Sequence, residues 1–290
     1  MSLSNFIPSV WSARILETLN TTHVYTNLMN RDYEGEISAL GDTVKINSIG
    51  RVTIGTYTKN TDISAAETLT DAQTTLTIDT ARYFNFQVDD IDAAQTKPKV
   101  MDAAMRDAAW GLADAIDLLI AGLYTQVPAA NTQGTNGAPV VGGSLTAGSA
   151  MYDLLVNMAV DLDESNVPDD GNRFVVVPAW AHGVMLKDNR FINSTETGNQ
   201  IRANGFIGKA AGFNVYKSNN VTKSGTASTD SHRIIAGHPM AWSYAEQVSE
   251  VEAYRPQLRF GDAVKGLLLC GYKVVRPTAL ALLYAKTAAS

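Results

Sequence analysis

The stretch of sequence that decides the fold is TVKINSIGRVTI at residues 43–54, followed by TLTIDTARYFNFQV at residues 75–88. In both segments apolar residues alternate with polar ones, which is the period of a half-buried β-strand. The alternating apolar positions are Val44, Ile46, Val52, Ile54, Leu76, Ile78, Phe84, Phe86 and Val88. Residues 59–74 between them are polar and offer little to a core. We therefore predict a long two-stranded β ribbon with a polar tip over residues 41–88.

Such a ribbon needs a surface to rest on. An isolated two-stranded ribbon is marginally stable in water at best. No other part of the sequence is evidently reserved for covering it. We therefore expect the ribbon to find its hydrophobic support on a second copy of the chain, which would make the single chain an incomplete object.

The ribbon is followed by the clearest helix signal in the chain, over residues 98–124. Pro98 suits a first helical turn, and the spacing predicts a continuous apolar stripe. The predicted stripe is Val100, Ala104, Ala108, Leu112, Ala115, Leu119 and Leu123. At ~1.5 Å per residue this helix is roughly 40 Å long, a rod to which other elements attach. Asp89, Asp90 and Asp92 precede it, and we interpret them as carboxylates favoured near a helix N-terminus.

The rest of the chain mixes helices with strands. Residues 128–148, rich in Gly, Ala, Asn and Thr, are interpreted as a loop and a domain boundary. Helices are predicted at 151–162 and 179–187, and strands at 174–177, 213–216, 233–236, 251–254, 264–275 and 280–284. Helices separated from antiparallel strands indicate the α+β class.

The N-terminal residues 1–34 are interpreted as an arm. Ile7, Val10, Trp11, Ile15 and Leu19 follow helical spacing. A helix this short is marginal by itself, so we expect it to gain order against another surface.

The composition describes a folded protein and argues against two function classes. Of the 290 residues, 45% are hydrophobic and 18% are charged, below the ~25% charged residues of ordinary domains, as expected where other chains cover the surface. The net charge of −6 argues against a nucleic-acid reader, which normally carries a basic stripe. No secretory signal and no apolar run near the ~20 residues of a spanning helix is evident, so no membrane is expected.

Templates for metal and cofactor binding are not met. The histidines are His23, His182, His232 and His238, and the spacing of the last two suits neither one helix face nor a usual zinc motif. The segment Gly205-Phe206-Ile207-Gly208-Lys209 has the wrong glycine spacing for a phosphate loop, and we interpret its glycines as turn residues. Residues 161–164, Asp-Leu-Asp-Glu, lack the remaining positions of a calcium loop and are interpreted as a solvated helix end.

Templates for catalysis are not met either. Glu246, Glu250 and Glu252 have no partner evident in the sequence and are interpreted as surface charge, and no Gly-x-Ser-x-Gly motif occurs. Cys270, the single cysteine, lies in an apolar run typical of a buried strand, where a reactive thiol is not expected. We therefore predict no catalytic, cofactor-binding or metal-binding residue, and no enzyme.

Two stretches resemble the major capsid proteins of tailed bacteriophages, the fold named after phage Hong Kong 97. The first comprises Phe174-Val175-Val176-Val177-Pro178, then 185–191 (MLKDNRF) and 205–219 (GFIGKAAGFNVYKSN). The second comprises 251–255 (VEAYR), 261–266 (GDAVKG) and 272–277 (YKVVRP). The order of elements also agrees with that family along nearly the whole chain.

The resemblance implies a domain organisation. Residues 1–34 would be an N-terminal arm lying across adjacent chains, and 35–88 the extended loop resting on a neighbouring subunit. Residues 89–128 and 244–290 would form the peripheral domain around its long spine helix. Residues 129–243 would form the axial domain, whose tips meet around the capsomer axes.

The resemblance also implies a function and partners. Self-assembly through hexamers and pentamers would give an icosahedral head in the virion, built in the bacterial host cytoplasm, which encloses double-stranded DNA without sequence-specific binding. Separate scaffold, portal and decoration proteins are possible partners; because no long charged leader precedes the arm, we expect a separately encoded scaffold or none. The family's namesake links Lys to Asn between subunits, and Lys45 and Lys59 lie on the predicted ribbon, but we expect no crosslinks here.

Two other readings remain open at the level of sequence. An encapsulin-like nanocompartment shell would use the same fold and would enclose an enzyme in place of DNA. An enzyme or β binding module forming a small oligomer would never reach the megadalton size of a shell.

Overall fold

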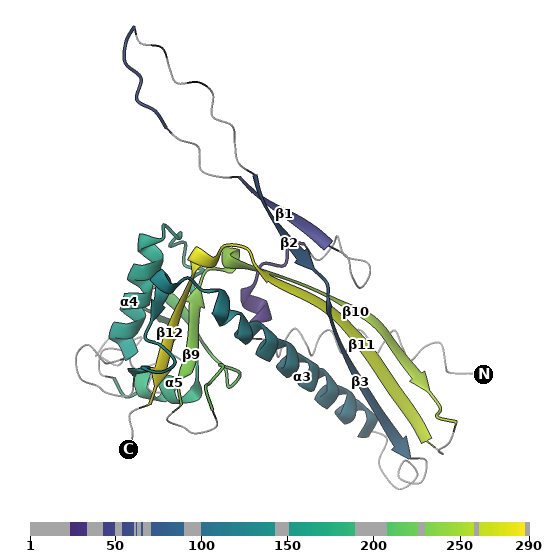
Figure 1. Cartoon of the computed structure of the whole chain (residues 1–290). Helices are drawn as coiled ribbons and strands as arrows, with labels where there is room; N and C mark the ends of the chain where they lie inside the picture. The colour runs from purple at the N-terminus through teal and green to yellow at the C-terminus, as the bar shows by residue number, and fades with distance from the viewer. Residues whose placement is uncertain are drawn as a thin grey trace.

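The computed structural model consists of two sheet-containing parts joined by a long helix, with a thin hairpin projecting from their junction (Figure 1). The mixture of helices and strands confirms the predicted α+β class. The structure describes residues 24–33, 43–49, 54–60, 62, 65, 71–89, 100–142, 151–188, 208–225, 230–257 and 261–287.

The first part is a three-stranded antiparallel sheet in the order β10-β11-β3. Its strands are β3 (Thr80–Asp89), β10 (Trp242–Tyr254) and β11 (Gly261–Val274). Helix α3 (Val100–Ala121) runs along the sheet and contacts β3 (Figure 1). Phe84 and Phe86 of β3 stack with ring centroids 6.0 Å apart and pack on the core that includes the helix.

Helix α3 confirms the predicted rod, and a 3-10 turn, η4 (Gly122–Gln126), extends it. The predicted stripe is wrong by about one position, because the buried side chains are Met105, Ala109, Leu112, Ala113, Ile116 and Ile120. Alanine occurs on several faces of this helix, so its positions do not show which face is buried. The packing of the larger Met and Ile side chains decides which face of the helix points to the core. By length and hydropathy alone, Ala104–Gln126 would pass for a membrane span, but 44% of an apolar 18-residue window within it is buried inside the protein.

The second part is a seven-stranded mixed sheet in the order β4-β12-β9-β6-β8-β7, with β5 also beside β12. Helices α4 (Met151–Glu164) and α5 (Ala179–Met185) contact each other, and α4 contacts β12. The strands are β4 (Thr132–Gln133), β5 (Val140–Val141), β6 (Phe174–Val177), β7 (Lys209–Ala210), β8 (Phe213–Lys217), β9 (His232–Gly237) and β12 (Leu280–Lys286). Short 3-10 turns are η2 (Thr26–Leu28), η5 (Ala129–Asn131), η6 (Pro239–Ala241) and η7 (Pro277–Ala279).

Most of these elements were predicted from the sequence. Helix α4 buries Leu154, Leu155, Met158 and Leu162, as its amphipathic spacing predicts. Strand β6 is buried at all four positions, and Pro178 separates it from α5. The strands predicted at 213–216 and 233–236 correspond to β8 and β9. The predicted strands near 251–284 correspond to β10, β11 and β12.

Two expectations about this sheet are wrong. The segment 128–148 is not simply a loop, since β4 and β5 within it pair in parallel with β12. In addition β12, expected in the peripheral domain with the rest of 244–290, pairs with β9 and belongs to the seven-stranded sheet. Two-residue strands carry no sequence periodicity, and the partner of a strand is chosen by tertiary packing.

The hairpin is shorter than predicted. Strands β1 (Thr43–Ile49) and β2 (Asp71–Thr77) pair antiparallel over their full length. Residues 80–88, expected in the ribbon, instead form β3 and pair with β11. Ile54, predicted to lie in a strand, lies outside regular structure and is 90% exposed. Alternation in the sequence marks strands but does not say which strands pair.

The base of the hairpin does find support on its own chain, contrary to our expectation. Leu76 and Ile78 are almost fully buried in a small core with Val44, Ile46, Ala245 and Leu269. Strand β2 ends just before Ile78, and the chain continues from there directly into β3. The base of the hairpin therefore packs on the outer face of β10 and β11, where Ala245 and Leu269 lie. The distal part of the hairpin lacks such cover, since all the residues described between 54 and 65 are exposed.

The described end of the N-terminal arm also packs on its own chain. Tyr25, Leu28 and Met29 are buried in the main core, and the Val24 N–H donates to Asp117 Oδ2 at 2.8 Å. The Trp242 Nε1–H donates to the Leu28 carbonyl at 3.0 Å. Residues 24–30 are therefore packed on the subunit body, and the expected contact of residues 1–34 with adjacent chains stays a prediction. The helix predicted from Ile7 to Leu19 lies outside the described residues.

Candidate assembly surfaces

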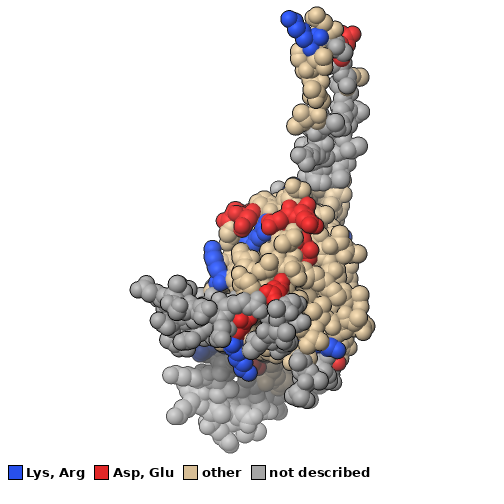
Figure 2. Space-filling model, turned by 90° about the vertical axis from the view of Figure 1, so that its left-hand side faces the viewer, with Lys and Arg blue, Asp and Glu red and all other residues tan. Residues whose placement is uncertain are grey.

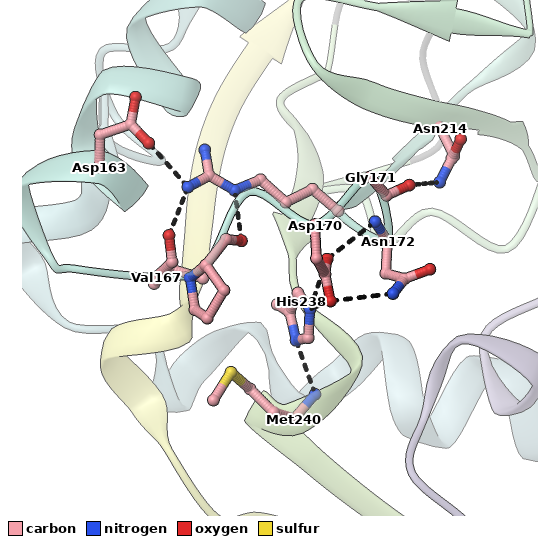
Figure 3. A network of polar contacts seen from close by, with 10 residues as sticks. Asp163, Val167, Asp170, Gly171, Asn172, Asn214, His238 and Met240 are labelled. Carbon is pink, nitrogen blue, oxygen red and sulfur yellow. Dashed lines mark hydrogen bonds and ion pairs between the residues drawn. The ribbon is translucent and has the colours of Figure 1, made fainter.

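His232 and His238 each contact residues of their own surroundings. The His232 ring packs edge-on to Trp180 and its Nδ1 lies 2.9 Å from the Asp230 carbonyl. The His238 ring contacts Asp170 and its Nδ1 accepts the Met240 N–H (Figure 3). Each ring thus has a separate structural role. Within the described part of the chain, no group of three or more His, Cys, Asp or Glu residues could hold a metal ion.

The turn 165–172 is followed by a buried arginine that sequence reasoning missed. Arg173 is 3% exposed; it donates to Asp163 Oδ1 at 2.7 Å and to the Val167 and Pro168 carbonyls (Figure 3). These bonds hold the connection between α4 and β6. The Asn172 N–H and side chain, with a smaller contribution from His238, lower the pKa of Asp170 to about 2. The only signal in the sequence was an arginine directly before an apolar strand.

The residues considered as a calcium loop and a phosphate loop are structural. Asp161 and Asp163 lie in the last turn of α4, where Asp161 accepts from Gln133 Nε2 at 2.7 Å and Asp163 pairs with Arg173. The helix end was predicted, but these two carboxylates are engaged rather than simply solvated. Gly208 has a φ of +67° before β7, which fits the predicted turn glycine, and Gly212 has a φ of +84° in the β7–β8 turn. Residues 205–207 lie outside the described part.

Of the three glutamates considered as an acid–base group, Glu246 and Glu252 have separate ion-pair partners in the structure. The Glu246 side chain is 7% exposed, pairs with Arg31 and accepts the Tyr244 hydroxyl at 2.7 Å. Glu252 pairs with Lys265 on the surface at 2.7 Å. Glu250 pairs with Leu267 in the β10–β11 ladder. Glu246 was expected at the surface, and its burial follows from Arg31, a partner 215 residues away in the sequence.

Cys270 is buried in β11, as predicted. Burial, reinforced by the charge of Glu246, raises the pKa of its thiol to about 12. Only the thiolate reacts readily, so alkylation at pH 8 should be at least about a hundredfold slower in the folded protein than in urea. Folding favours the neutral thiol of Cys270. The stability that this thiol contributes is fully present below its pKa in the unfolded chain, about 8.5, and is lost as the pH rises through its raised pKa in the folded protein. Mass spectrometry of iodoacetamide-treated protein measures the rate; equal rates in both states would contradict the buried thiol.

Exposed apolar side chains, which also include Trp110 and Leu118 of α3 and Tyr216 of β8, mark several surfaces on the subunit, and three of them are candidate contacts. The first is the distal hairpin, where Ile54 is 90% and Tyr57 is 71% exposed. The second is the outer face of the three-stranded sheet, where Tyr83 is 77% exposed beside Leu267 and Lys265 in a hollow of about 290 Å³. The third is the outer side of α4, which carries Val156 and Val160 one turn apart.

These surfaces are suited to contacts between chains. Scattered exposed apolar residues are normal, but Ile54 and Tyr57 stand on a thin hairpin that holds them away from the subunit body (Figure 1). Figure 2 views the molecule from the side that carries α4 and shows acidic side chains gathered on the upper part of this face, below the hairpin. Apolar centres with a charged surround are typical of protein–protein interfaces.

Comparison with known proteins identifies the family. The model of the family described as "Phage capsid protein" matches residues 71–283. The chain belongs to the phage capsid protein family. A search of curated proteins found no match to this capsid protein.

Solved structures agree with the family. The capsid protein is 30% identical to a chain of Mycobacterium phage Che8, with a TM-score of 0.70 over 90% of each chain. It is 18% identical to a chain of the capsid of cyanophage P-SCSP1u, with a TM-score of 0.67 over 87% of this chain and 85% of that one. The resemblance to tailed-phage major capsid proteins is confirmed, and the protein is a structural major capsid protein of the virion shell.

The nanocompartment alternative has less support. A chain from a virus-like particle of Pyrococcus furiosus has a TM-score of 0.58 and covers 96% of the capsid protein and 99% of its own length. At 10% identity this similarity shows the fold alone. The architecture is therefore shared with a chain of this virus-like particle, and the family match favours the phage capsid.

Proposed function

We propose that the subunit builds hexamers and pentamers of an icosahedral head, and that the distal hairpin of each subunit binds the body of its neighbour. The observation that carries this proposal is the exposure of Ile54 and Tyr57 on a hairpin whose base is fixed. The packed core around Leu76 and Ile78 fixes the direction in which the hairpin projects. The described residues of the chain do not cover the apolar side chains at its tip. Many modest contacts of this kind make a stable shell through multivalency.

The hollow beside Tyr83 is a suitable receiving surface. It lies on the face of the three-stranded sheet that also carries the hairpin base, since Leu267 borders both. Lys265 at its edge pairs with Glu252 and lies 5.3 Å from the centre of the Tyr254 ring, which gives the apolar centre a polar rim. A neighbouring tip that carries Ile54 and Tyr57 together with Lys59 and Asp62 matches this composition.

The proposal predicts that Ile54→Asp combined with Tyr57→Asp abolishes shells while leaving a folded subunit. Burying two unpaired carboxylates in an apolar contact costs at least several kcal/mol for every contact in the shell. Negative-stain electron microscopy and sedimentation velocity measure assembly, and circular dichroism measures folding.

The conservative variant Tyr57→Phe serves as the matched control. It keeps the ring and should assemble like the wild type, because apolar area and not the hydroxyl makes the contact. Normal shells from the double aspartate variant would show that the hairpin tip is not an assembly contact.

The domain organisation follows from the same proposal. Residues 1–34 form the arm, whose described end is anchored in the body, and 35–88 contain the extended loop. Residues 89–128 with 244–279 form the peripheral domain. Residues 129–243, joined by β12, form the axial domain around the capsomer axis. Supporting this, β12 lies between β9 and the short strands β4 and β5.

A phage shell also has DNA and other proteins as partners. The head encloses double-stranded DNA without reading its sequence, which is supported by the net charge of −6. Assembly takes place in the host cytoplasm, and scaffold, portal and decoration proteins are further partners. The subunit acts by assembly and not by catalysis.

We also propose that no covalent crosslink joins the subunits. Lys45 is exposed on β1 and Lys59 on the distal hairpin, so both amines are accessible. Among the described residues, no aspartate or glutamate forms an ion pair with either lysine. No described carboxylate is therefore placed beside these amines to act as the acid catalyst of a crosslink. Purified shells boiled in detergent should therefore run as a single 31.1 kDa band; a ladder of covalent oligomers would contradict this.

A further inference from the structure

Arg233 of β9 is a buried cation with few partners. The residue is 8% exposed, and its guanidinium lies 4.7 Å from the centre of the Tyr124 ring. Among the described residues, no aspartate or glutamate forms an ion pair with it, and its Nε–H has no hydrogen-bond acceptor. A guanidinium does not lose its proton in a protein. A buried charge that lacks an opposite charge is costly, so a carboxylate beside Arg233 would stabilise the fold.

The side chain that Arg233 does reach is an amide. Its Nη2 donates to Asn136 Oδ1 over a long distance of 3.4 Å. An amide oxygen carries only a partial negative charge, so it compensates a guanidinium less well than a carboxylate does. A carboxylate oxygen in the same place would lie within ion-pair distance of Arg233. The side chain of Asn136 therefore occupies the position where a negative charge is favoured.

Asn136 and Gly137 form the exposed tip of a small loop with a fixed base. The loop, residues 134–139, connects β4 and β5, which both pair with β12. Below the tip, Thr135 and Ala138 exchange two backbone hydrogen bonds of 3.2 Å. Both tip residues are exposed, and no atom lies within 4 Å of the position of a Cβ on Gly137. Solvent and a rearranged backbone both have room here.

An asparagine followed by glycine is able to lose its amide nitrogen without an enzyme. The Gly137 nitrogen gives its proton to water or hydroxide and attacks Asn136 Cγ, which closes a succinimide ring. The bond from Cγ to Nδ2 breaks, and the nitrogen takes up a proton from solvent and leaves as ammonia. Water then opens the ring to a carboxylate, as aspartate or isoaspartate, and nothing is oxidised or reduced. Among the described residues, no hydrogen bond engages the Gly137 N–H.

Arg233 is placed to favour both stages of this reaction. During the attack, negative charge develops on Asn136 Oδ1, which is the atom that Arg233 Nη2 faces. A positively charged donor already aimed at a developing oxyanion stabilises the transition state. After the ring opens to aspartate, the new carboxylate lies beside the guanidinium, and a charge-assisted bond replaces the weaker bond to the amide. The buried cation then has the opposite charge that it lacked.

From this arrangement we propose that Asn136 is a site of self-modification, at which the folded subunit converts the side-chain amide into a carboxylate that pairs with Arg233. The change adds a negative charge to the subunit and ties the loop between β4 and β5 to β9. The proposal concerns one chain and is independent of the hairpin-tip contact and of the shell.

Peptide mass spectrometry of the full-length protein after incubation at about pH 8 measures the reaction. The deamidated fraction at Asn136 should rise with time, and Arg233→Met should deamidate at least about tenfold more slowly, because it lacks the donor to the oxyanion. Equal rates in the two proteins would overturn the role of Arg233. A wild type that keeps Asn136 intact while the urea-unfolded chain deamidates would overturn the whole proposal.

Gly137→Ala is the matched control for ring closure. The added Cβ meets no atom of the folded protein, so the melting temperature should change little. The same Cβ disturbs the approach of the attacking nitrogen, and deamidation should fall at least about tenfold. Deamidation of this variant at the wild-type rate would contradict attack by the Gly137 nitrogen.

Asn136→Asp supplies the carboxylate directly and tests the pairing without the reaction. It should raise the melting temperature by about 2–4 °C, since a pair with a buried cation is stronger than the bond to the amide. The gain should be absent when Arg233→Met is also present. A melting temperature equal to or below that of the wild type would show that a carboxylate at this position does not pair with Arg233.

Discussion

Replacing Trp242 by alanine is expected to lower the free energy of unfolding of the unassembled subunit by about 3–5 kcal/mol. Trp242 is fully buried at the start of β10. Its ring stacks on Phe174 of the seven-stranded sheet at 5.3 Å and meets Tyr25 edge-on at 6.5 Å. Truncation leaves a cavity where three segments meet, and it also removes the donor to the Leu28 carbonyl.

The second consequence of Trp242→Ala is that residues 25–30, which pack on the subunit body, become detached from it. Residues 25–30 are held by this side chain and by the backbone bonds between Asn30 and residues 242 and 244. We expect hydrogen exchange in residues 25–30 to rise toward that of the unfolded chain. Urea unfolding followed by circular dichroism gives the stability.

Trp242→Phe is the matched control, since it keeps a ring and loses only the indole donor and some volume. It should cost distinctly less than the alanine variant. Equal losses for the two variants would mean that the hydrogen bond to Leu28, and not the packing, stabilises this junction.

Replacing Gly271 by alanine is the second change with a large expected effect, at least about 2 kcal/mol of destabilisation. A Cβ on Gly271 would lie 2.5 Å from the Thr77 carbonyl oxygen and 2.6 Å from Ile78 Cδ1. A backbone oxygen cannot rotate away, so the junction of β2 and β3 must move off β11. That movement opens the small core around Leu76 and Ile78 and changes the direction of the whole hairpin.

The effect on assembly should exceed the effect on stability. A tilt at the base displaces a tip that projects far from the body (Figure 1), so Gly271→Ala should fail to form regular shells even under conditions in which it folds. Thermal melts give the stability and electron microscopy the particles.

Gly111→Ala serves as the control for a glycine-to-alanine change. No atom lies within 4 Å of a Cβ at Gly111, and the residue is in the middle of α3. Alanine is favoured over glycine there by about 1 kcal/mol, so this variant should be stabilised. Regular shells from Gly271→Ala would contradict the role assigned to the hairpin base.

The candidate surfaces were only partly predictable from the sequence. Alternation around Val44 and Leu76 indicated a ribbon, and the polar run between its strands indicated a projecting tip. Nothing in the sequence indicated that Arg31 would bury Glu246, or that Val156 and Val160 would face solvent on a helix whose other apolar residues form the core. Those outcomes depend on residues that are distant in the sequence.

The sequence by itself determined the local elements: the rod of α3, the amphipathic α4, the buried β6 bounded by Pro178, and the strands of the C-terminal part. These follow from side-chain periodicity and turn chemistry, which act between residues close together in the chain. Only the tertiary structure decided that β3 leaves the hairpin for β11, that β12 joins the seven-stranded sheet, and that Leu76 and Ile78 rest on Ala245 and Leu269. Strand partners and buried surfaces are selected by packing between distant segments, and that packing leaves no periodic signal in either segment alone.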